Sequence, residues 1–524
     1  MVDSLLFSST NIWVTVILGT VAILLYIVGV LVYQILFHPL AKYPGPWLAK
    51  LTNLYAGYHS WKGDLHIDMW DVHNKYDIYG HGKSFKKAQR YGAMVHRAPN
   101  TLTVIDKMKH GKKRRIISQG FSDAALKDHE VVILEQVQHL CTQLKGGKQG
   151  EETPIGLWSP PKDMARLSMF ISASVTSLWL TRRGTDDYFA FDVMSNIIFG
   201  VPWSTLRSPT YRFVPEVIEK SNIRVGTLSQ APEMSFLRLD KVIFPEAIRA
   251  RDIFVQFVDE MLRQGTKHAA KTGRGVFAIL SKSNDPETGQ PLKMRELGGE
   301  SATLIVAGTD TTSTALAACL FYLSHYRSSC DRATAEVRAV FESSEDIRMG
   351  PLMSKCVFLR ACIDESMRMS PPAASSLWRE SEETGATVDG EYIPPGIDVG
   401  TCIYSIHHNP LYYPRPFSFR PERWLSTDTN EGQVDIRLAR SAFNPFSIGP
   451  RSCIGKSLAY VELQLVLAHI LWRFDIRLAS GELGKTGEGK EGAEFGRHRI
   501  DEYQLWDHLT AAKHGPFLEF SPRE

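Results

Sequence analysis

A cysteine loop near the carboxyl end constrains this chain more than any other ten residues do. The loop runs from Phe446 to Gly455 and also carries Gly449, Arg451 and Cys453. The glycines leave little side-chain bulk around the cysteine, and the guanidinium of Arg451 offers a planar cation for a carboxylate. The apolar spacing of residues 456–471 predicts a helix that begins just after the loop. We therefore predict that the helix dipole and Arg451 lower the pKa of the Cys453 thiol and favour the thiolate.

A thiolate held in this way is a good axial ligand for haem iron, whereas the alternative is a buried structural cysteine. Phe446, Gly449, Arg451, Cys453 and Gly455 fit the signature F-x-x-G-x-R-x-C-x-G of the cytochromes P-450, which are haem-thiolate monooxygenases. The chain resembles that family over roughly residues 38–478. The resemblance implies that Cys453 is the proximal ligand of heme b (iron protoporphyrin IX) and that Arg451 pairs with a haem propionate. It also implies a mainly α fold with small β-sheets, the triangular cytochrome P-450 fold, behind one N-terminal transmembrane helix.

Composition excludes several other classes of protein. The chain has 524 residues and a formal net charge of +3, with acidic and basic residues interspersed, so no nucleic-acid footprint is present. Its 7 cysteines are odd in number and form no C-x-x-C pair, which indicates a reducing compartment without structural disulfides. No linker rich in Pro, Gly and Ser divides the chain before its final fifty residues.

An apolar segment near the amino terminus predicts a membrane anchor. Residues 12–37 carry no charge, and a helix of that length reaches about 39 Å, enough to cross a hydrocarbon core of about 30 Å. A cleaved signal peptide would need a basic head and a shorter apolar run. Because the first basic residues, Lys42 and Lys50, follow the segment, we expect the catalytic domain to be cytosolic. We predict an anchor over 1–37 and a haem-thiolate monooxygenase domain over 38–524. By resemblance to microsomal members, the protein is expected to be a single-pass protein of the endoplasmic reticulum membrane.

A polar sequence lies at the centre of a predicted helix over residues 294–326. Residues 307–312 read A-G-T-D-T-T, and three threonines with a glycine are poor helix formers. An acid beside an alcohol can relay protons from water, so a catalytic purpose accounts for this pattern. By resemblance, Asp310 and Thr311 deliver protons during dioxygen activation, and Gly308 makes room for dioxygen. The alternative is a polar stripe on a surface helix.

Two further motifs follow in the order that the family has. Glu365 and Arg368 are spaced i,i+3 and share one helix face, a spacing that usually means only a surface ion pair. Arg423 stands in a P-E-R-W sequence upstream of the cysteine loop. The resemblance implies that these three residues form a buried triad, which locks the cysteine loop onto the helix.

Other cationic residues match positions that face haem propionates. By resemblance these are His110 and Arg114 in a predicted helix, and Arg379 in a predicted strand beyond the E-x-x-R motif. A basic run is more often a solvated face, and the run over 107–115 is also a candidate docking patch for an acidic redox partner.

Nucleotide binding is not predicted. Residues 479–486 satisfy a relaxed phosphate-loop pattern, but the Gly-rich sequence after Thr486 has no apolar period, so we predict a mobile loop there. No G-x-G-x-x-G dinucleotide site is convincing either. Electrons from NADPH must therefore arrive through a partner, which the resemblance identifies as an NADPH-cytochrome reductase.

The front third departs from the family in two places. Similar proteins carry two strands of the first sheet between the positions of residues 76 and 77, which are adjacent in this chain. Residues 94–102 are either a candidate substitute for the missing strand or the loop that normally follows it. An extra apolar segment occupies residues 166–183. Either a coding segment was lost and another retained, or the chain is a family variant with a reshaped sheet.

The resemblance implies a haem-thiolate monooxygenase that inserts one oxygen atom from O2 into a lipophilic small molecule. The sequence resembles fungal enzymes of secondary-metabolite biosynthesis. Substrate is expected to contact Ile305, Val306 and Ala307 above the haem, and Ala374 and Leu377 in a turn of small residues. Two alternatives stay open: a haem-thiolate isomerase or dehydratase, and a non-catalytic variant disabled by the altered front third. The expected partners are the reductase, the substrate and membrane lipid, with no nucleic acid.

Overall fold

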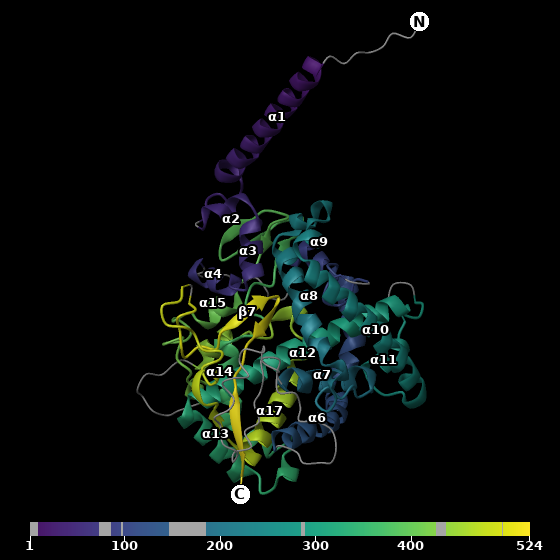
Figure 1. Cartoon of the computed structure of the whole chain (residues 1–524), viewed down its shortest axis with the longest axis vertical. Helices are drawn as coiled ribbons and strands as arrows, with labels where there is room; N and C mark the ends of the chain where they lie inside the picture. The colour runs from purple at the N-terminus through teal and green to yellow at the C-terminus, as the bar shows by residue number, and fades with distance from the viewer. Residues whose placement is uncertain are drawn as a thin grey trace, which may run out of the picture.

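One long helix, α12 (Met294–His325), runs through the centre of the molecule (Figure 1). The computed structural model describes residues 9–43, 45–72, 85–95, 98–145, 185–284, 289–425, 436–494 and 496–523. From Ala315 to Leu323, every side chain of α12 is buried, because other helices cover it on all sides. Its neighbours in the core are α7 (Thr185–Phe199), α8 (Phe213–Gln230), α10 (Pro245–Thr272), α14 (Val357–Met369) and α17 (Lys456–Arg473), and α6 (Asp123–Leu144) packs against α7 and α17. The helix predicted over residues 294–326 is thus confirmed to within one residue.

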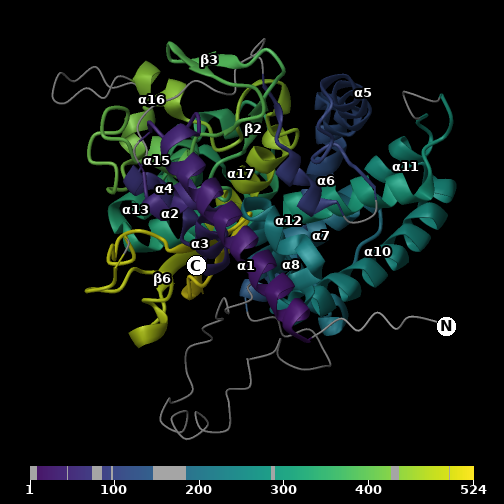
Figure 2. The same cartoon turned by 90° about the horizontal axis from the view of Figure 1, so that it is seen from above.

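Shorter helices surround this core. They are α2 (Trp47–Leu51), α3 (Leu54–Lys62), α4 (Leu65–Val72), α5 (Lys107–Ser118), α9 (Leu239–Ile243), α11 (Val276–Ser281), α13 (Arg327–Val340), α15 (Ile403–His407) and α16 (Ile436–Ala442). Figure 2 shows α10 and α11 on one side of the molecule, and α15, α16 and strand β3 on the other.

Within the described residues, four small antiparallel sheets complete the fold. One has the order β1-β2-β5, from Phe85–Lys87, Arg379–Ser381 and Asp398–Val399. The others pair β3 (Ala386–Val388) with β4 (Glu391–Ile393), β6 (Phe474–Leu478) with β9 (Leu518–Pro522), and β7 (Leu505–His508) with β8 (Thr510–Lys513). A mainly α fold with small sheets was predicted, and the structure confirms it.

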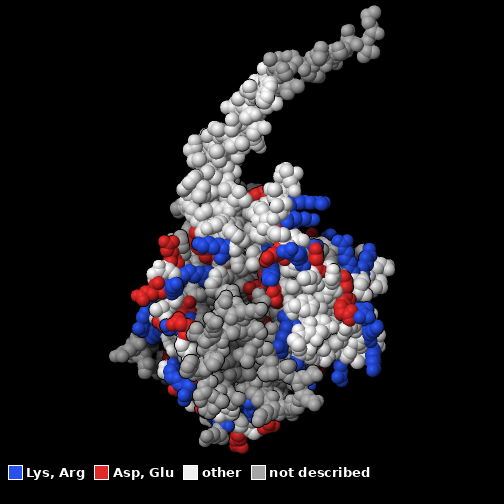
Figure 3. Space-filling view, in the orientation of Figure 1, with Lys and Arg blue, Asp and Glu red and all other residues white. Residues whose placement is uncertain are grey.

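The amino-terminal helix α1 (Ser9–Val32) projects away from the body (Figure 1). Figure 3 shows no blue or red atoms along this helix, while charged residues are spread over the body. The apolar span Trp13–Phe37 has a mean hydropathy of 2.7, and 0% of its most apolar window is buried. The second helix that is long and apolar enough to cross a membrane, α12, is 67% buried and is therefore a core helix. The exposed α1 fits a membrane anchor.

The structure describes the predicted loop after Thr486 and part of the front third of the chain. The segment after Thr486 is packed rather than mobile, because the Glu488 carboxylate accepts a hydrogen bond from His325 Nε2 at 3.0 Å and the Lys490 N–H donates to the Arg497 carbonyl at 2.7 Å. Residues 487–494 form turns and irregular backbone rather than a helix. The junction at 76–77 and the segment 166–183 lie outside the described residues. Where they are described, residues 94–102 form a helix end and turns rather than a substitute strand.

A buried carboxylate fixes the segment that leads into the cysteine loop. Glu365 lies on α14, fully buried, and accepts hydrogen bonds from Arg368 Nε and Nη2 and from Arg423 Nε, each at 2.9 Å. The Arg420 N–H and the Trp424 Nε1–H donate to the same carboxylate at 2.9 and 3.0 Å. Burial alone would raise the pKa of Glu365, but Arg368 and Arg423 outweigh burial and lower it. The structure thus brings together the three residues that the resemblance implied.

Replacing this carboxylate should be costly. We expect Glu365→Gln to lower the free energy of unfolding by about 3–5 kcal/mol, because it leaves two buried guanidinium groups without their counter-charge. Chemical denaturation measures the loss. The matched control is Glu260→Gln, since Glu260 and Arg263 have the same i,i+3 spacing on the surface of α10, where Arg263 is 62% exposed.

The control should unfold like the parent protein. Because the pKa of Glu365 is lowered, the stability it contributes is present above the usual glutamate pKa of about 4.3 and is lost as the pH falls through the folded-state value. Equal stability of the two variants at neutral pH would show that the triad is no stronger than a surface pair.

Candidate active site

The cysteine loop holds Cys453 at the start of α17. The Cys453 N–H donates to the Phe446 carbonyl at 2.8 Å, which closes the loop on itself. Gly449 has φ +76°, a conformation that favours glycine, and this explains why the loop needs glycine there. A Cβ on Gly455 would lie 3.9 Å from the Cys453 sulfur, so the signature glycine borders the thiol directly. Cys453 is exposed while the other cysteines, all of them described, are buried, so the alternative of a buried structural cysteine is not met.

The electrostatics of the thiol differ from the sequence prediction. Cys453 is open at its surface but lies deep within the molecule, and desolvation there raises the pKa of its thiol; the backbone N–H groups of Gly455 and Lys456 and the charge of Arg114 oppose the rise without outweighing it. The predicted lowering of the thiol pKa by the helix dipole and Arg451 is therefore wrong for the free thiol. Coordination of a metal ion deprotonates a thiol in such a site, whatever its unperturbed pKa.

Four predicted basic residues, His110, Arg114, Arg379 and Arg451, converge beside the loop. Arg114 on α5 donates to the Ser452 carbonyl at 2.7 Å, and Arg451 donates to the Val104 and Ile105 carbonyls at 2.6 and 2.8 Å. Burial, with Arg379 and Arg114 nearby, lowers the pKa of Arg451 to about 10. Burial and the neighbouring cations lower the pKa of His110 to about 3, so its ring is neutral at pH 7.

Lys87 is a fifth member of this cluster and was missed by the sequence analysis. It ends β1, directly opposite Arg379 on β2. Burial and the charges of Arg379, Arg451 and Arg114 lower its pKa well below the usual lysine value. Its Nζ donates to the Leu102 carbonyl and lies 4.4 Å from the Tyr91 ring centroid. No local motif marks Lys87, because its partner in the sheet is almost three hundred residues away.

The donor set of this basic cluster (Lys87, His110, Arg114, Arg379 and Arg451) fits haem. Like charges in adjacent strands destabilise a sheet, and buried cations need counter-charges. Haem presents two propionates at one edge and its iron at the centre. The basic cluster therefore matches the propionates, and the exposed Cys453 beside it matches the iron.

Helix α12 supplies a different set of polar groups. Thr311 Oγ1 donates to the Ala307 carbonyl at 2.6 Å, a bond within the helix. The Asp310 Oδ2 atom accepts from Asn222 Nδ2 at 2.7 Å and from Thr510 Oγ1 at 2.9 Å. Burial raises the pKa of Asp310 to about 7, against the lowering effect of the Thr510 hydrogen bond and of Lys513.

Gly308 serves helix packing rather than an open pocket. A Cβ added at Gly308 would lie 2.4 Å from the Met194 Cε atom on α7. The space beside this glycine is therefore already filled by Met194, so it does not make the room for dioxygen that was predicted. The missing side chain lets α7 and α12 approach closely.

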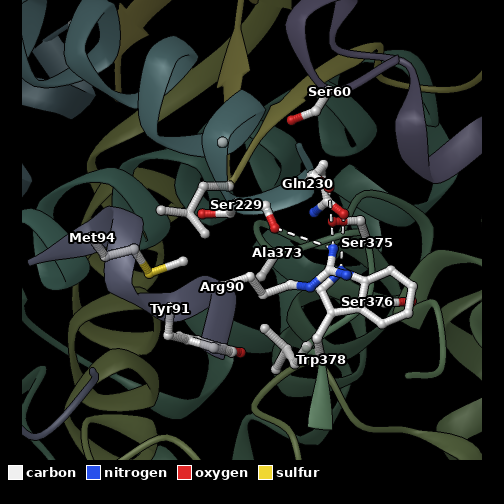
Figure 4. Close-up of a pocket in the computed structure, with 13 residues that line it drawn as sticks. Ser60, Arg90, Tyr91, Met94, Ser229, Gln230, Ala373, Ser375, Ser376 and Trp378 are labelled. Atoms are coloured by element: carbon white, nitrogen blue, oxygen red, sulfur yellow. Dashed lines mark hydrogen bonds between the residues drawn. The ribbon is translucent and has the colours of Figure 1, made fainter. Parts of the chain in front are cut away.

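A cavity lies beside the turn that carries Leu377. Figure 4 shows Arg90 against Trp378, and the guanidinium carbon lies 4.9 Å from the Trp378 ring centroid. Trp378 Nε1 donates to Gln230 Oε1 at 2.9 Å, and Arg90 Nε binds Asp398 at 2.7 Å. The residues that line this cavity are Ser60, Arg90, Tyr91, Met94, Gly226, Ser229, Gln230, Ala373, Ser375, Ser376, Leu377, Trp378 and Leu509.

The five predicted substrate contacts divide into two groups. Leu377 lines this cavity, Ala307 is exposed, and Val306 is half-buried. Ile305 and Ala374 are each 1% exposed and lie in packed clusters, so they are not accessible to a substrate. Helical periodicity turns Ile305 into the core, and Ala374 packs against the Tyr404 region. The neighbouring Ala373 lines the cavity instead.

Comparison with known proteins agrees with this geometry. The protein-family model for cytochrome P450 matches residues 186–498. The chain is 49% identical to cytochrome P450 monooxygenase atnE of Emericella nidulans, covering 94% of each chain. It is 44% identical to cytochrome P450 monooxygenase AKT7 of Alternaria alternata, covering 95% of this chain and 96% of the relative.

A solved structure shares the fold. The crystal structure of the cytochrome P450DA heme domain superimposes with a TM-score of 0.60, at 19% identity over 84% of each chain. The monooxygenase names of the relatives favour that activity over an isomerase, a dehydratase or a non-catalytic variant. The chain belongs to the cytochrome P450 family and is a haem-thiolate monooxygenase.

Proposed function

We propose that Cys453 is the proximal ligand of heme b in this protein. The observation that carries the proposal is one exposed cysteine in the signature loop, next to a cluster of basic side chains that are largely withdrawn from solvent. When bound, the haem would supply the activation of dioxygen. The chain's own contribution is to hold the sulfur at the start of α17 and to neutralise the propionates.

Replacing the sulfur tests this directly. We expect Cys453→Ser to abolish both the haem-thiolate pigment and NADPH-dependent turnover, because a hydroxyl is a poor ligand for haem iron. The carbon-monoxide difference spectrum of the reduced protein measures the pigment. Cys330→Ala, which removes a buried thiol on α13, is the matched control and should keep the thiolate-type Soret band. A full thiolate-type spectrum in Cys453→Ser would refute the assignment.

We propose that the basic cluster binds the haem propionates. A neutral His110 ring can donate one hydrogen bond, while Arg114, Arg379, Arg451 and Lys87 provide positive charge. Arg114 and Arg451 are held by carbonyls of the loop and of residues 104–105, so their guanidinium groups are fixed before a ligand arrives. Such pre-organisation reduces the entropy lost on binding.

Lys87 should therefore matter for cofactor retention. We expect Lys87→Met to raise the rate of haem loss about tenfold, the scale of one hydrogen bond to a charged group. Transfer of haem to an excess of apomyoglobin measures that rate. Lys86→Met is the matched control, because Lys86 pairs with Glu380 at 3.0 Å. Equal haem-loss rates for the two variants would remove Lys87 from the propionate site.

Asp310 and Thr311 are the proposed proton donors. The pKa of Asp310, near 7, suits a group that gives and takes protons at physiological pH. Thr311 is its neighbour on α12, and a hydroxyl can accept one proton while donating another. Together they would move solvent protons toward the substrate side of the haem. The cavity beside Leu377 is the proposed substrate site. Val306 and Ala307 on α12 do not line this cavity and stay predicted substrate contacts.

The cellular setting is part of the proposal. We assign residues 1–37 to an anchor in the endoplasmic reticulum membrane and 38–524 to the cytosolic catalytic domain, reduced by an NADPH-cytochrome reductase. The apolar, exposed α1 supports the anchor, and the fungal relatives support a lipophilic substrate from secondary metabolism. Oxygen uptake that requires both NADPH and the reductase would support this scheme. Turnover that continues when NADPH or the reductase is left out would contradict it.

A further inference from the structure

A second cavity lies between α8, α12 and the β7–β8 hairpin, on the side of α12 to which Asp310 points. About 20 Å³ inside it is open to water, and about 10–15 Å³ is enough to hold one water molecule. Its polar lining comes from four sources: α7, α8, α12 and the hairpin. These residues are Asp187, Glu219, Asn222, Asp310, Thr314, His508, Thr510 and Lys513.

Asp310 is held at this cavity by two partners remote in sequence. Asn222 Nδ2 and Thr510 Oγ1 both donate to Asp310 Oδ2, and Asn222 Nδ2 also donates to Thr510 Oγ1 at 2.9 Å. The three side chains form a closed triangle of hydrogen bonds. Thr311 takes no part in it, because its hydroxyl donates to the Ala307 carbonyl.

The far wall of the cavity is strongly charged. Lys513 Nζ lies 2.6 Å from an Asp187 carboxylate oxygen and 3.5 Å from an Asp186 oxygen, and it donates to Ser313 Oγ at 3.0 Å. Burial alone would lower the pKa of Lys513, but Asp187 and Asp186 raise it, so the ammonium stays charged. Charged and polar walls stabilise water in such a space.

We infer that this cavity is the site where Asp310 takes up protons from water, and that Asn222 and Thr510 are positioning residues for its carboxyl group. The inference rests on the proposed role of Asp310. In each transfer, a hydronium O–H bond breaks and leaves water as an O–H bond forms on the Asp310 carboxyl group. The carboxyl O–H then breaks as the proton passes to the Thr311 hydroxyl, which gives up its hydrogen bond to the Ala307 carbonyl and releases its own proton to the oxygen atom that is reduced to water. Two such transfers match the two electrons that the reductase supplies per oxygen atom reduced to water.

The two positioning residues differ chemically. The Asn222 amide nitrogen can only donate, so it stabilises the ionised carboxylate. The Thr510 hydroxyl can donate to the carboxylate or accept from the protonated acid, so it can remain bonded in both protonation states. Thr510 is therefore the partner that should matter most during proton transfer, and a serine in its place should serve as well.

The experiment measures NADPH oxidation by the holoenzyme with its reductase, in H2O and in D2O, without an organic substrate. The observables are the rate, the solvent isotope effect and the hydrogen peroxide released per NADPH, normalised to the carbon-monoxide difference spectrum. We expect Thr510→Val to lower the rate of NADPH oxidation that leads to water about tenfold, which is the scale of one hydrogen bond to a charged group. The solvent isotope effect and the hydrogen peroxide released per NADPH should both rise. Thr510→Ser should restore all three.

The pH profile gives a second readout. Proton delivery by Asp310 should be fastest below its pKa, near 7, and fall as the pH rises through that value. Loss of the Thr510 hydrogen bond should raise the pKa and move the falling limb to higher pH. The other titratable groups that line the cavity, Asp187, Glu219, His508 and Lys513, are unchanged in this variant.

Controls separate the possible failures. Thr227→Val removes a buried hydroxyl that donates within α8, and it should behave like the parent protein. If Asp310→Asn leaves the isotope effect and peroxide yield unchanged, the proposed role of Asp310 itself is wrong. If Asp310→Asn impairs both but Thr510→Val matches Thr227→Val, the role of Asp310 stands and the uptake site is refuted.

Discussion

Buried positive charge is the constraint on which the active site depends. Five basic side chains from β1, α5, β2 and the cysteine loop lie within electrostatic reach of one another, and burial together with mutual repulsion lowers the pKa values of Lys87, His110 and Arg451. Carbonyl oxygens satisfy several of their N–H groups but carry no full negative charge. The propionates of a haem would supply that charge. Cofactor binding and folding of this region are therefore expected to reinforce each other.

The glutamate triad shows why one motif can have two meanings. Glu365 with Arg368 and Glu260 with Arg263 have the same spacing, and sequence periodicity alone cannot separate them. The first pair is fully buried and gains Arg423 from a segment more than fifty residues away. The second lies on the surface of α10. Only the order of motifs along the chain, which matches the family, identified the first pair as special.

Local sequence predicted what local geometry decides: α12, the helix after Cys453, and the apolar helix α1. It failed where tertiary contacts decide. Lys87, Asn222 and Thr510 acquire their roles from partners that the fold brings together, and no motif surrounds them. Gly308 faces Met194 across a helix interface that the sequence could not place. The pKa of Cys453 was predicted from its neighbours in the chain, whereas burial dominates it.

The β7–β8 hairpin places two functions on adjacent residues. His508 pairs with Thr510, so Leu509 alone forms the turn, and its φ of +86° is strained for a residue with a branched side chain. Leu509 lines the cavity of Figure 4, while Thr510 donates to Asp310 at the second cavity. One peptide bond therefore separates a residue at the proposed substrate site from one that holds the proposed proton donor. Because a turn of one residue leaves little room for adjustment, we expect a displacement of Leu509 to move the Thr510 hydroxyl and so to disturb its hydrogen bond to Asp310.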